Sequence, residues 1–483
     1  MGYGTDANGK GEVTFRFTHT IDGKAEASAE TFGVINPSTA AVFAQCPDAT
    51  REQLDRAVAA ARRAFADWSR LSFAERRGYL RRLAAKVREN GPELAALITR
   101  EQGKPLSNAV GEVAGTAMSL EKMAEIELND EVLRDDGKRR FTLHYRPMGV
   151  VGAIAPWNVP LALAAHKIAQ ALYAGSTLVL KPSPYTPLST LLMGEISREV
   201  MPPGVFNVLG GGNALGQWLT EHPGVDKITF TGSVATGKKV MASAAATLKR
   251  VTLELGGNDP AIILDDADLS SSIARIFNGA FANCGQICMA IKRVYVPEPM
   301  YDKVCDGLVE IANSYRVGDG FEPDVQMGPL QNKMQFDKVL DVLEDTKKQP
   351  GARILSGGHT LNRPGYYLAP TIVAGLKDDA RLVTEEQFGP VLPVLSYRDL
   401  DDVVARANDT RMGLCASVWT TDIPKGEEVA SRIEAGTVWV NHHIGSEPDV
   451  PFGGFKESGV GREHGVMGLQ AYMEAQVINT PVQ

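Results

Sequence analysis

Short runs of consecutive apolar residues recur at regular intervals in the middle of the chain. Between them lie amphipathic stretches, so each run predicts a buried strand and each stretch predicts a helix. Strands that alternate with helices of roughly 10 to 15 residues are typical of βαβ units, whose strands form a parallel sheet. The predicted strands are residues 150–154, 177–180, 205–209 and 227–230, and the predicted helices are 161–173, 188–200 and 213–221.

A second α/β unit is predicted in the second half, where the alternation returns with less regularity. One helix is predicted to begin at Ser270 and to end near Cys288, and another to cover residues 299–315. Because each unit has its own apolar strands, we expect two packed units with a cleft between them. The strands predicted for the second unit are residues 261–264, 293–296, 352–355, 391–395 and 437–440.

A helical layer is predicted before the first unit. Thr50 is a candidate N-cap, and Ser72 with Glu75 three residues later matches the capping-box pattern. Two further helices are expected to begin near Pro92 and Ser107. Residues 139–144 alternate between polar and apolar positions, which we interpret as an edge strand.

Composition and charge exclude several functional classes. The formal net charge of −8 over 483 residues argues against nucleic acid or an anionic membrane as the main partner. The longest apolar stretches are too short to span a membrane, and the first residues lack the apolar core of a secretory signal. Five scattered cysteines suit a reducing compartment, so we expect a cytoplasmic protein.

Three polar segments follow predicted parallel strands, where ligands of such sheets bind. They are Trp157-Asn158, Lys181-Pro182-Ser183 and Thr231-Gly232-Ser233. Residues 232–237 lie where a strand turns into a helix, and free backbone N–H groups there suit a pyrophosphate. The segment is neither GxGxxG nor a P-loop, so a tight turn that needs small residues is an equal alternative.

The stretch from 251 to 288 carries the candidate chemistry. Glu254 stands beside Gly256-Gly257, and Cys288 follows Gly285-Gln286, at a separation of 288 − 254 = 34 residues. A thiolate is a good nucleophile, and a nearby carboxylate can activate water to release a covalent intermediate. A lone cysteine is more often a small buried hydrophobe. Cys284 and Cys288 lack a second cluster at zinc spacing, so no metal is expected.

Seven motifs occur in a fixed order and together resemble the NAD(P)-dependent aldehyde dehydrogenase superfamily. The resemblance covers the chain from about Asn36 to its end. The motifs are Pro156-Trp157-Asn158, Lys181-Pro182-Ser183, Phe230-Thr231-Gly232-Ser233, Leu253-Glu254-Leu255-Gly256-Gly257-Asn258, Gly285-Gln286-Ile287-Cys288, Glu385-Glu386-Gln387-Phe388-Gly389-Pro390 and Pro451-Phe452-Gly453-Gly454.

The resemblance implies catalytic roles for three residues. Cys288 matches the nucleophile that attacks the aldehyde. Asn158 matches the side chain that stabilises the oxyanion together with the Cys288 backbone N–H. Glu254 matches the base that activates water to hydrolyse the thioester. Family members that transfer the acyl group to coenzyme A commonly lack this glutamate, so a free carboxylic acid is the expected product.

The resemblance also implies a nicotinamide cofactor. NAD-preferring relatives often carry glutamate where this chain has Pro184, so NAD is favoured here while NADP use stays open. Glu386 is expected to bind the nicotinamide ribose and Phe388 to pack near the ring. The full expected set of cofactor residues is Trp157, Lys181, Ser183, Pro184, Gly212, Phe230, Gly232, Ser233, Glu386 and Phe388.

The expected substrate pocket departs from the family pattern. His166 and Ser446 stand where several relatives carry aromatic residues, and Ala282 stands where some carry phenylalanine. A roomier and more polar pocket is therefore predicted. An equal alternative is that apolar side chains such as Met118 and Met123 fill the gap. The predicted pocket residues are His166, Ala282, Ile287, Met289, His443 and Ser446.

The implied architecture is α/β and aldehyde dehydrogenase-like. A Rossmann-type parallel-sheet cofactor domain is expected over 1–127 and 148–252, an α/β catalytic domain over 253–464, and a β-hairpin oligomerisation flap over 128–147 and 465–483. The flap implies a homodimer or homotetramer, and the substrate is an aldehyde. Two alternatives are a cysteine-dependent ester or thioester hydrolase or acyltransferase, and a catalytically silent protein, which is disfavoured because Cys288, Glu254 and Asn158 are all present.

Overall fold

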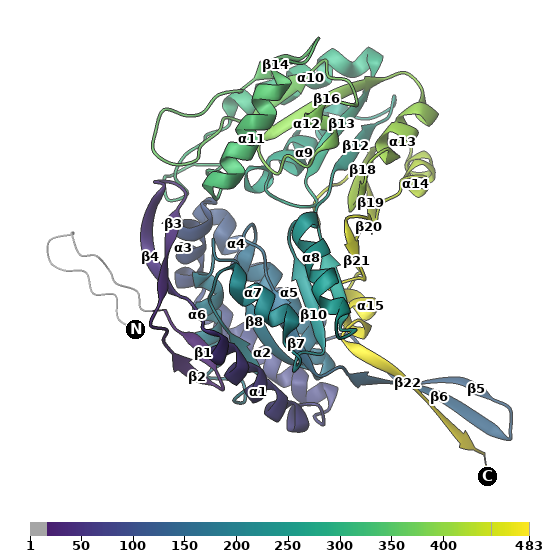
Figure 1. Ribbon diagram of the computed structural model, residues 1–483. Helices are drawn as coiled ribbons and strands as arrows, with labels where there is room; N and C mark the ends of the chain where they lie inside the picture. Colours follow the sequence, from purple (N-terminus) through teal and green to yellow (C-terminus); the bar gives the residue numbers. More distant parts are fainter. Residues whose placement is uncertain (1–16, 446, 483) are drawn as a thin grey trace.

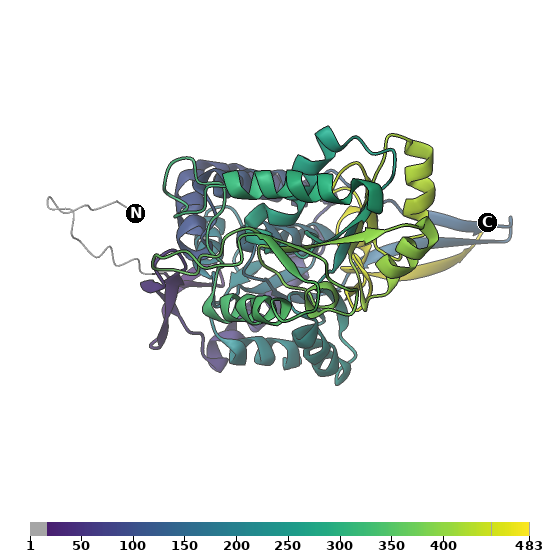
Figure 2. The ribbon, with the colours of Figure 1, turned by 90° about the horizontal axis from the view of Figure 1, so that it is seen from above.

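The computed structural model describes residues 17–445 and 447–482. Two sheet-containing units lie one above the other, and a narrow β-ribbon projects from the side of the molecule (Figure 1). Viewed from above, the ribbon extends away from the body on one side (Figure 2). Among the described residues, no helix has the length and apolar character needed to cross a membrane.

Eight described strands form the first sheet, in the order β2-β1-β9-β8-β7-β10-β11-β21. The five from β9 to β11 run parallel, which confirms the βαβ prediction. Ile154 lies opposite Lys181 and Phe230, so the carboxyl ends of these strands lie level. The bounds are β1 His19–Ile21, β2 Lys24–Glu26, β7 Val150–Ile154, β8 Thr177–Lys181, β9 Phe206–Val208, β10 Lys227–Thr231, β11 Arg250–Glu254 and β21 Gly459–Val460.

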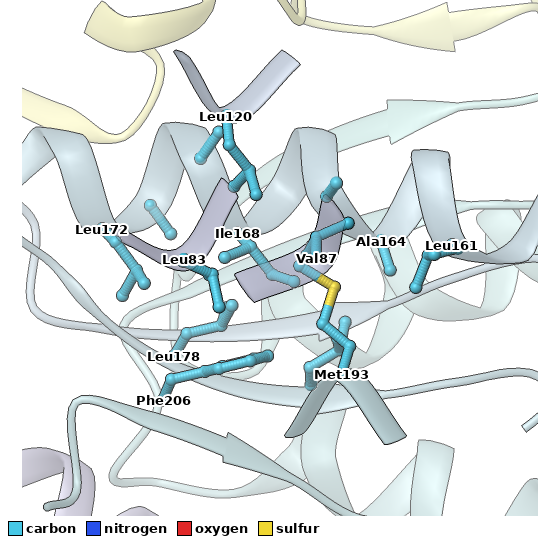
Figure 3. Packing of buried hydrophobic residues seen from close by; sticks show 14 of the residues in the cluster. Leu83, Val87, Leu120, Leu161, Ala164, Ile168, Leu172, Leu178, Met193 and Phe206 are labelled. Atoms are coloured by element: carbon cyan, nitrogen blue, oxygen red, sulfur yellow. The ribbon is translucent and has the colours of Figure 1, made fainter. Parts of the chain in front are cut away.

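Helices cover both faces of this sheet because alternate strand residues point to opposite sides. In β8, Leu178 and Leu180 pack with α2 to α6, whereas Val179 packs with α1, α7 and α8. Figure 3 shows the first of these clusters, where Leu83, Ile168 and Phe206 converge. The helices are α1 Arg51–Trp68, α2 Phe73–Glu89, α3 Gly91–Gln102, α4 Leu106–Met123, α5 Pro160–Ala174, α6 Leu188–Ser197, α7 Asn213–Glu221 and α8 Val234–Ala245.

Two of the predicted helix starts in the N-terminal layer, at Thr50 and Ser72, are confirmed by their caps. Thr50 accepts a hydrogen bond from the Gln53 backbone N–H, and the Gln53 side chain bonds the Thr50 backbone in return. Ser72 and Glu75 make the same reciprocal pair at the start of α2. Both boxes satisfy backbone N–H groups that a helix cannot satisfy internally.

The second sheet has the order β14-β15-β16-β13-β12-β18-β19 and is parallel except for β14. Helices α9 and α10 cover one face, and α11 to α14 cover the other. The bounds are β12 Asp259–Ile263, β13 Ile291–Pro297, β14 Arg353–Ser356, β15 Thr371–Ala374, β16 Val391–Tyr397, β18 Cys415–Trp419, β19 Thr437–Val440, α9 Leu269–Phe281, α10 Tyr301–Ser314, α11 Lys333–Thr346, α12 Arg381–Thr384, α13 Leu400–Asn408 and α14 Ile423–Ser431.

Helix α9 ends at Phe281, so the prediction that it continues to near Cys288 is wrong. Asn283 and Cys284 have φ angles of 52° and 60°, and Gly285 follows at 70°. These left-handed conformations are incompatible with a right-handed α-helix. Cys284 and Cys288 therefore do not share a helix face.

The projecting ribbon is a three-stranded antiparallel sheet in the order β22-β6-β5. Strand β6 is central and pairs with β22 along its whole length, so interpreting residues 139–144 as an edge strand is wrong. The edges are β5 and β22 instead. The bounds are β5 Glu131–Asp135, β6 Arg139–Pro147 and β22 Met473–Pro481. The remaining described elements are β3 Thr31–Asn36, β4 Ala41–Pro47, β17 Met412–Gly413, β20 Phe455–Lys456, α15 Gly465–Gln470 and the 3-10 helices η1 Ala282–Gly285 and η2 Glu298–Met300.

Candidate active site

Glu254 is the last residue of β11, at the edge where the parallel strands end. Its side chain is buried, and among the described residues neither carboxylate oxygen has a hydrogen-bond partner. Burial raises the pKa of this carboxyl well above its usual value, and the nearby Glu463 carboxylate raises it further. A raised pKa makes the ionised carboxylate a stronger base than a solvated one.

The glycine pair after Glu254 allows two other chain segments to approach. The Gly257 backbone N–H donates to Glu386 Oε1 at 3.0 Å. A Cβ atom at Gly256 would lie 2.5 Å from Glu386 Oε2, and one at Gly257 would lie 2.4 Å from the Cys288 carbonyl oxygen. Larger residues would therefore displace either Glu386 or the loop that carries Cys288.

A left-handed turn leads from α9 to Cys288. The side chain of Gln286 closes this turn by donating from Nε2 to the Asn283 carbonyl at 2.9 Å. Its Oε1 accepts from the Gln331 backbone N–H at 2.8 Å, which anchors the turn to the loop before α11. A left-handed backbone conformation costs free energy at a residue other than glycine, and it persists only where the surrounding structure holds it.

Cys288 is half-buried, and Lys292 lies beneath its loop. The Lys292 ammonium donates to the carbonyl oxygens of Ile287 at 2.6 Å, Cys288 at 3.2 Å and Ala290 at 3.2 Å. Burial raises the pKa of the Cys288 thiol to about 12, and the Lys292 cation opposes this shift. The thiol is therefore protonated near neutral pH in the protein alone.

Asn158 lies in the loop between β7 and α5 and contacts the Cys288 loop directly. Its Nδ2 donates to the Gln286 carbonyl at 2.9 Å. The Asn158 carbonyl accepts from Asn283 Nδ2 at 2.9 Å and from Lys104 Nζ at 3.2 Å. Both the side chain and the backbone of this residue are thus held in place.

Lys104 belongs to a buried ion pair that the sequence analysis missed. Its Nζ lies 2.6 Å from Glu112 Oε2, and the two side chains are 5% and 3% exposed. Glu112 Oε1 accepts from the Leu161 backbone N–H at 2.9 Å in the first turn of α5. The pair therefore joins α4, the start of α5 and the Asn158 loop.

A second buried ion pair lies behind Glu254. Lys167 Nζ in α5 lies 2.7 Å from Glu463 Oε1, and the two side chains are 0% and 4% exposed. Thr229 in β10 bonds both partners, at 3.2 Å to Lys167 and 3.3 Å to Glu463. No sequence pattern indicates this pair, because a lysine on a helix is usually solvated.

The segments after β7, β8 and β10 lie along one sheet edge. Lys181 is buried, donates to the Pro182 carbonyl at 3.1 Å, and has its pKa lowered to about 8 by burial. Ser183 accepts from the Tyr185 N–H at 3.3 Å, and Pro184 next to it is half-buried. Trp157 meets Phe388 edge-on, with ring centroids 5.3 Å apart.

Small residues occupy the helix starts at this edge. Ser233 caps α8 by accepting from the Thr236 N–H at 3.3 Å, and Gly212 is the N-cap of α7. The Gly232 N–H donates to the Glu254 carbonyl at 3.0 Å. A Cβ atom at Gly232 would lie 2.5 Å from the ring of Phe230, which is itself buried in β10.

The predicted pocket residues lie on three segments. His166 in α5 contacts His464 edge-on, with ring centroids 4.4 Å apart. Ala282, Ile287 and Met289 follow α9 and are half-buried. Met118 is 41% exposed on α4, and Met123 is buried in the core cluster of the first sheet. Ser446 lies outside the described residues.

His443 is buried beneath the same loop. Its Nε2 is 2.9 Å from the Met289 carbonyl and 3.9 Å from Asp259 Oδ2. Burial lowers the pKa of His443 to about 3, so the ring is neutral. A neutral ring at this distance donates to the Met289 carbonyl.

Comparison with known proteins identifies the family. Residues 24–478 match the sequence profile of the aldehyde dehydrogenase family. Aldehyde dehydrogenase 1A1 of Gallus gallus is 40% identical over 94% of this chain and 91% of its own length. Aldehyde dehydrogenase LUC3 of Fusarium sp is 38% identical over 96% of this chain and 98% of its own length.

Solved structures of similar sequence share the fold. An NAD+ complex of aldehyde dehydrogenase from Bacillus cereus has a TM-score of 0.95 at 38% identity, covering 97% of each chain. A betaine aldehyde dehydrogenase from Staphylococcus aureus in complex with NAD+ has a TM-score of 0.93 at 34% identity, covering 97% of this chain and 95% of that one. The predicted aldehyde dehydrogenase-like α/β fold is confirmed, and the chain belongs to the aldehyde dehydrogenase family.

Proposed function

We propose that this protein oxidises an aldehyde to the carboxylic acid with NAD as the oxidant. Family membership supports the reaction class. The observation that carries the assignment to this site is the junction at Gly257, where the Cys288 carbonyl, Glu386 and the end of β11 meet. That junction brings a thiol, a buried carboxylate and the candidate cofactor residues to one sheet edge.

Cys288 acts as the nucleophile. Its sulfur attacks the carbonyl carbon of the aldehyde, forming a C–S bond and an oxyanion. The thiol must first lose its proton, and Glu254 is the nearby acceptor whose raised pKa suits that task. The Lys292 cation under the Cys288 carbonyl favours the thiolate electrostatically.

Asn158 stabilises the oxyanion. In the protein alone its Nδ2 donates to the Gln286 carbonyl, so the amide turns from Gln286 to the oxyanion when substrate binds. Removing one such donor costs about 2.7–4 kcal/mol of transition-state stabilisation in other enzymes. The clamped Asn158 backbone keeps this rotation local to the side chain.

Glu254 completes the reaction as a general base. One carboxylate oxygen takes a proton from water, and the water oxygen attacks the thioester carbon. For this step Glu254 must already have released the thiol proton to solvent. The C–S bond then breaks, the proton taken from water passes to the Cys288 sulfur, and the acid leaves. NAD, when bound, would supply the oxidant for the step before this hydrolysis, in which the substrate carbon bonded to Cys288 loses a hydride.

The residues along the sheet edge fit such a cofactor. Glycines and a serine at the starts of α7 and α8 leave room for a pyrophosphate, which favours helix N-termini. Lys181 and Glu386 offer a donor and an acceptor for ribose hydroxyls. Pro184 provides neither a contact nor a repulsion for a 2′-phosphate, so we propose NAD as the preferred cofactor with NADP tolerated. Trp157, Ser183, Phe230 and Phe388 complete the proposed set.

The projecting ribbon is proposed as an oligomerisation flap. Both edge strands, β5 and β22, are largely exposed and carry unpaired backbone groups. Exposed edges of this kind tend to be paired by another chain, so a homodimer or homotetramer is proposed. The five cysteines are free thiols, which supports a reducing cytoplasmic setting.

The test is the absorbance of reduced nicotinamide with NAD and NADP in parallel. The panel contains aliphatic, aromatic, hydroxylated and carboxylated aldehydes, and Cys288→Ala is the control. We expect turnover that Cys288→Ala abolishes while cofactor binding persists. Turnover that survives this substitution would exclude Cys288 as the nucleophile. Faster oxidation of hydroxylated aldehydes would support the polar pocket that the sequence predicts at His166, Ala282, Ile287, Met289, His443 and Ser446.

A further inference from the structure

Two histidines and a glutamate from distant parts of the sequence meet beside the proposed active site. They are His166 in α5 and the adjacent pair Glu463 and His464 before α15. The imidazole rings of the two histidines stand edge to face at 89°, with centroids 4.4 Å apart. One donor atom from each of the three residues lies within 4.8 Å of the other two.

The backbone holds this cluster in place. Glu463 pairs with Phe452 through two backbone hydrogen bonds of 2.7 and 2.8 Å. His464 adopts φ 63°, a left-handed conformation that a side chain other than glycine rarely takes. The Lys167–Glu463 ion pair fixes α5 against the same segment. One donor is therefore presented by α5, and the other two by a segment that backbone hydrogen bonds hold against Phe452.

We propose that His166, Glu463 and His464 form a binding site for a divalent transition-metal ion such as Zn²⁺. Two imidazoles and one carboxylate are a ligand set that Zn²⁺ uses, with a fourth position left for water. Zinc–nitrogen distances of about 2.0–2.1 Å place tetrahedral ligands roughly 3.4 Å apart. Small side-chain rotations bring donors within 4.8 Å of one another to that spacing.

The surrounding charges set a moderate affinity. The Lys167 ammonium opposes a second cation, but it and Thr229 both bond Glu463 through Oε1. We therefore expect micromolar rather than nanomolar binding. The site shares His166 with the predicted substrate pocket and Glu463 lies near Glu254, but it uses neither Cys288 nor the cofactor residues, so metal binding can be measured without turnover.

The test uses the full chain, free of purification tags, with Cys288→Ala to remove the most exposed thiol. Calorimetry with ZnCl2 should give one equivalent of bound ion. Adding His464→Leu or His166→Leu should weaken zinc binding at least 10-fold. Removing a metal ligand costs more affinity than removing a residue that only supports a ligand, and the latter typically costs about 10–100-fold. His222→Leu is the matched control, since His222 lies 3.2 Å from Asp55 outside the cluster. It should bind as tightly as the parent.

Cobalt provides a second readout. Bound Co²⁺ should show visible d–d bands without the near-ultraviolet sulfur-to-metal band that a cysteine ligand produces. Absence of binding by the Cys288→Ala protein would overturn the proposal. Equal binding by both histidine variants, or a sulfur band, would also overturn it. Thermal melting and circular dichroism check folding, and His166→Gln replaces His166→Leu if the latter unfolds.

Discussion

Removing Lys104 should destabilise the protein strongly and slow its chemistry. The perturbation is Lys104→Met, which leaves Glu112 without its cation at 3% side-chain exposure. Breaking a buried pair from one side typically costs about 3–5 kcal/mol, because the remaining charge is uncompensated. The Asn158 carbonyl also loses a charged donor at 3.2 Å.

A second substitution separates charge from packing. Glu112→Gln keeps an acceptor for the Leu161 N–H at 2.9 Å but removes the charge. The double variant Lys104→Met/Glu112→Gln should therefore regain most of the lost stability, leaving a deficit of about 1–3 kcal/mol from imperfect hydrogen bonding. Lys333→Met is the matched control, because the Lys333–Asp337 pair is 70% and 54% exposed. It should change stability by less than about 1 kcal/mol.

The assay is urea unfolding followed by tryptophan fluorescence, together with kcat and KM. Lys104→Met should have the lowest unfolding midpoint of the four proteins. Its kcat should fall below that of the double variant at equal folded concentration. The reasoning is refuted if Lys104→Met is no less stable than Lys333→Met. It is also refuted if adding Glu112→Gln to Lys104→Met restores no stability, because the loss would then not come from the uncompensated charge on Glu112.

Three further outcomes are expected. The rate of Cys288 alkylation by iodoacetamide should rise about tenfold per pH unit towards pH 12, because the thiolate fraction of a thiol with a pKa of about 12 rises in that proportion. At pH 9 this fraction is about 500-fold lower than that of a thiol with a pKa of about 9. Lys292→Met should slow the alkylation of Cys288 further. An alkylation rate that reaches a plateau at pH 9 would contradict the raised pKa. Glu254→Gln should accumulate an acyl-enzyme visible by mass spectrometry, whereas normal turnover without an adduct would exclude the base role. Pro184→Glu should lower the ratio of NADP-linked to NAD-linked kcat/KM at least 10-fold through charge repulsion, and an unchanged ratio would mean that position 184 does not face the adenosine ribose.

The parallel-sheet framework was predictable because buried strands and amphipathic helices have different periods. The predicted bounds of β7, α7 and β19 agree with the structure. The end of α9 was not predictable, because the residues after it carry no glycine or proline before Gly285. The left-handed conformations of Asn283 and Cys284 depend on hydrogen bonds to Asn158 and Gln286, which are distant or later in the chain.

The buried charges could not be predicted from local sequence. Lys104, Lys167 and Lys292 each sit in stretches where a lysine normally reaches water. Their burial depends on partners far away, such as Glu463, which is 296 residues from Lys167. The histidine cluster has the same origin, since His166 and His464 meet only when α5 packs beside α15. The spacing of apolar residues indicates which face of a helix or strand is buried, but it does not indicate which distant side chain packs against that face.

The buried lysines explain why the candidate site is ordered before any ligand binds. Lys104 donates to the carbonyl of Asn158, and Lys292 donates to three carbonyls around Cys288. Carbonyl oxygens in irregular loops lack the partners that helices and sheets supply, and a buried ammonium provides up to three donors at once. The loops are thereby fixed without regular secondary structure. Because these carbonyls already have donors, the Asn158 side-chain amide is the group left to move. Its Nδ2 can leave the Gln286 carbonyl and donate to an oxyanion instead, which requires little reorganisation of the loops.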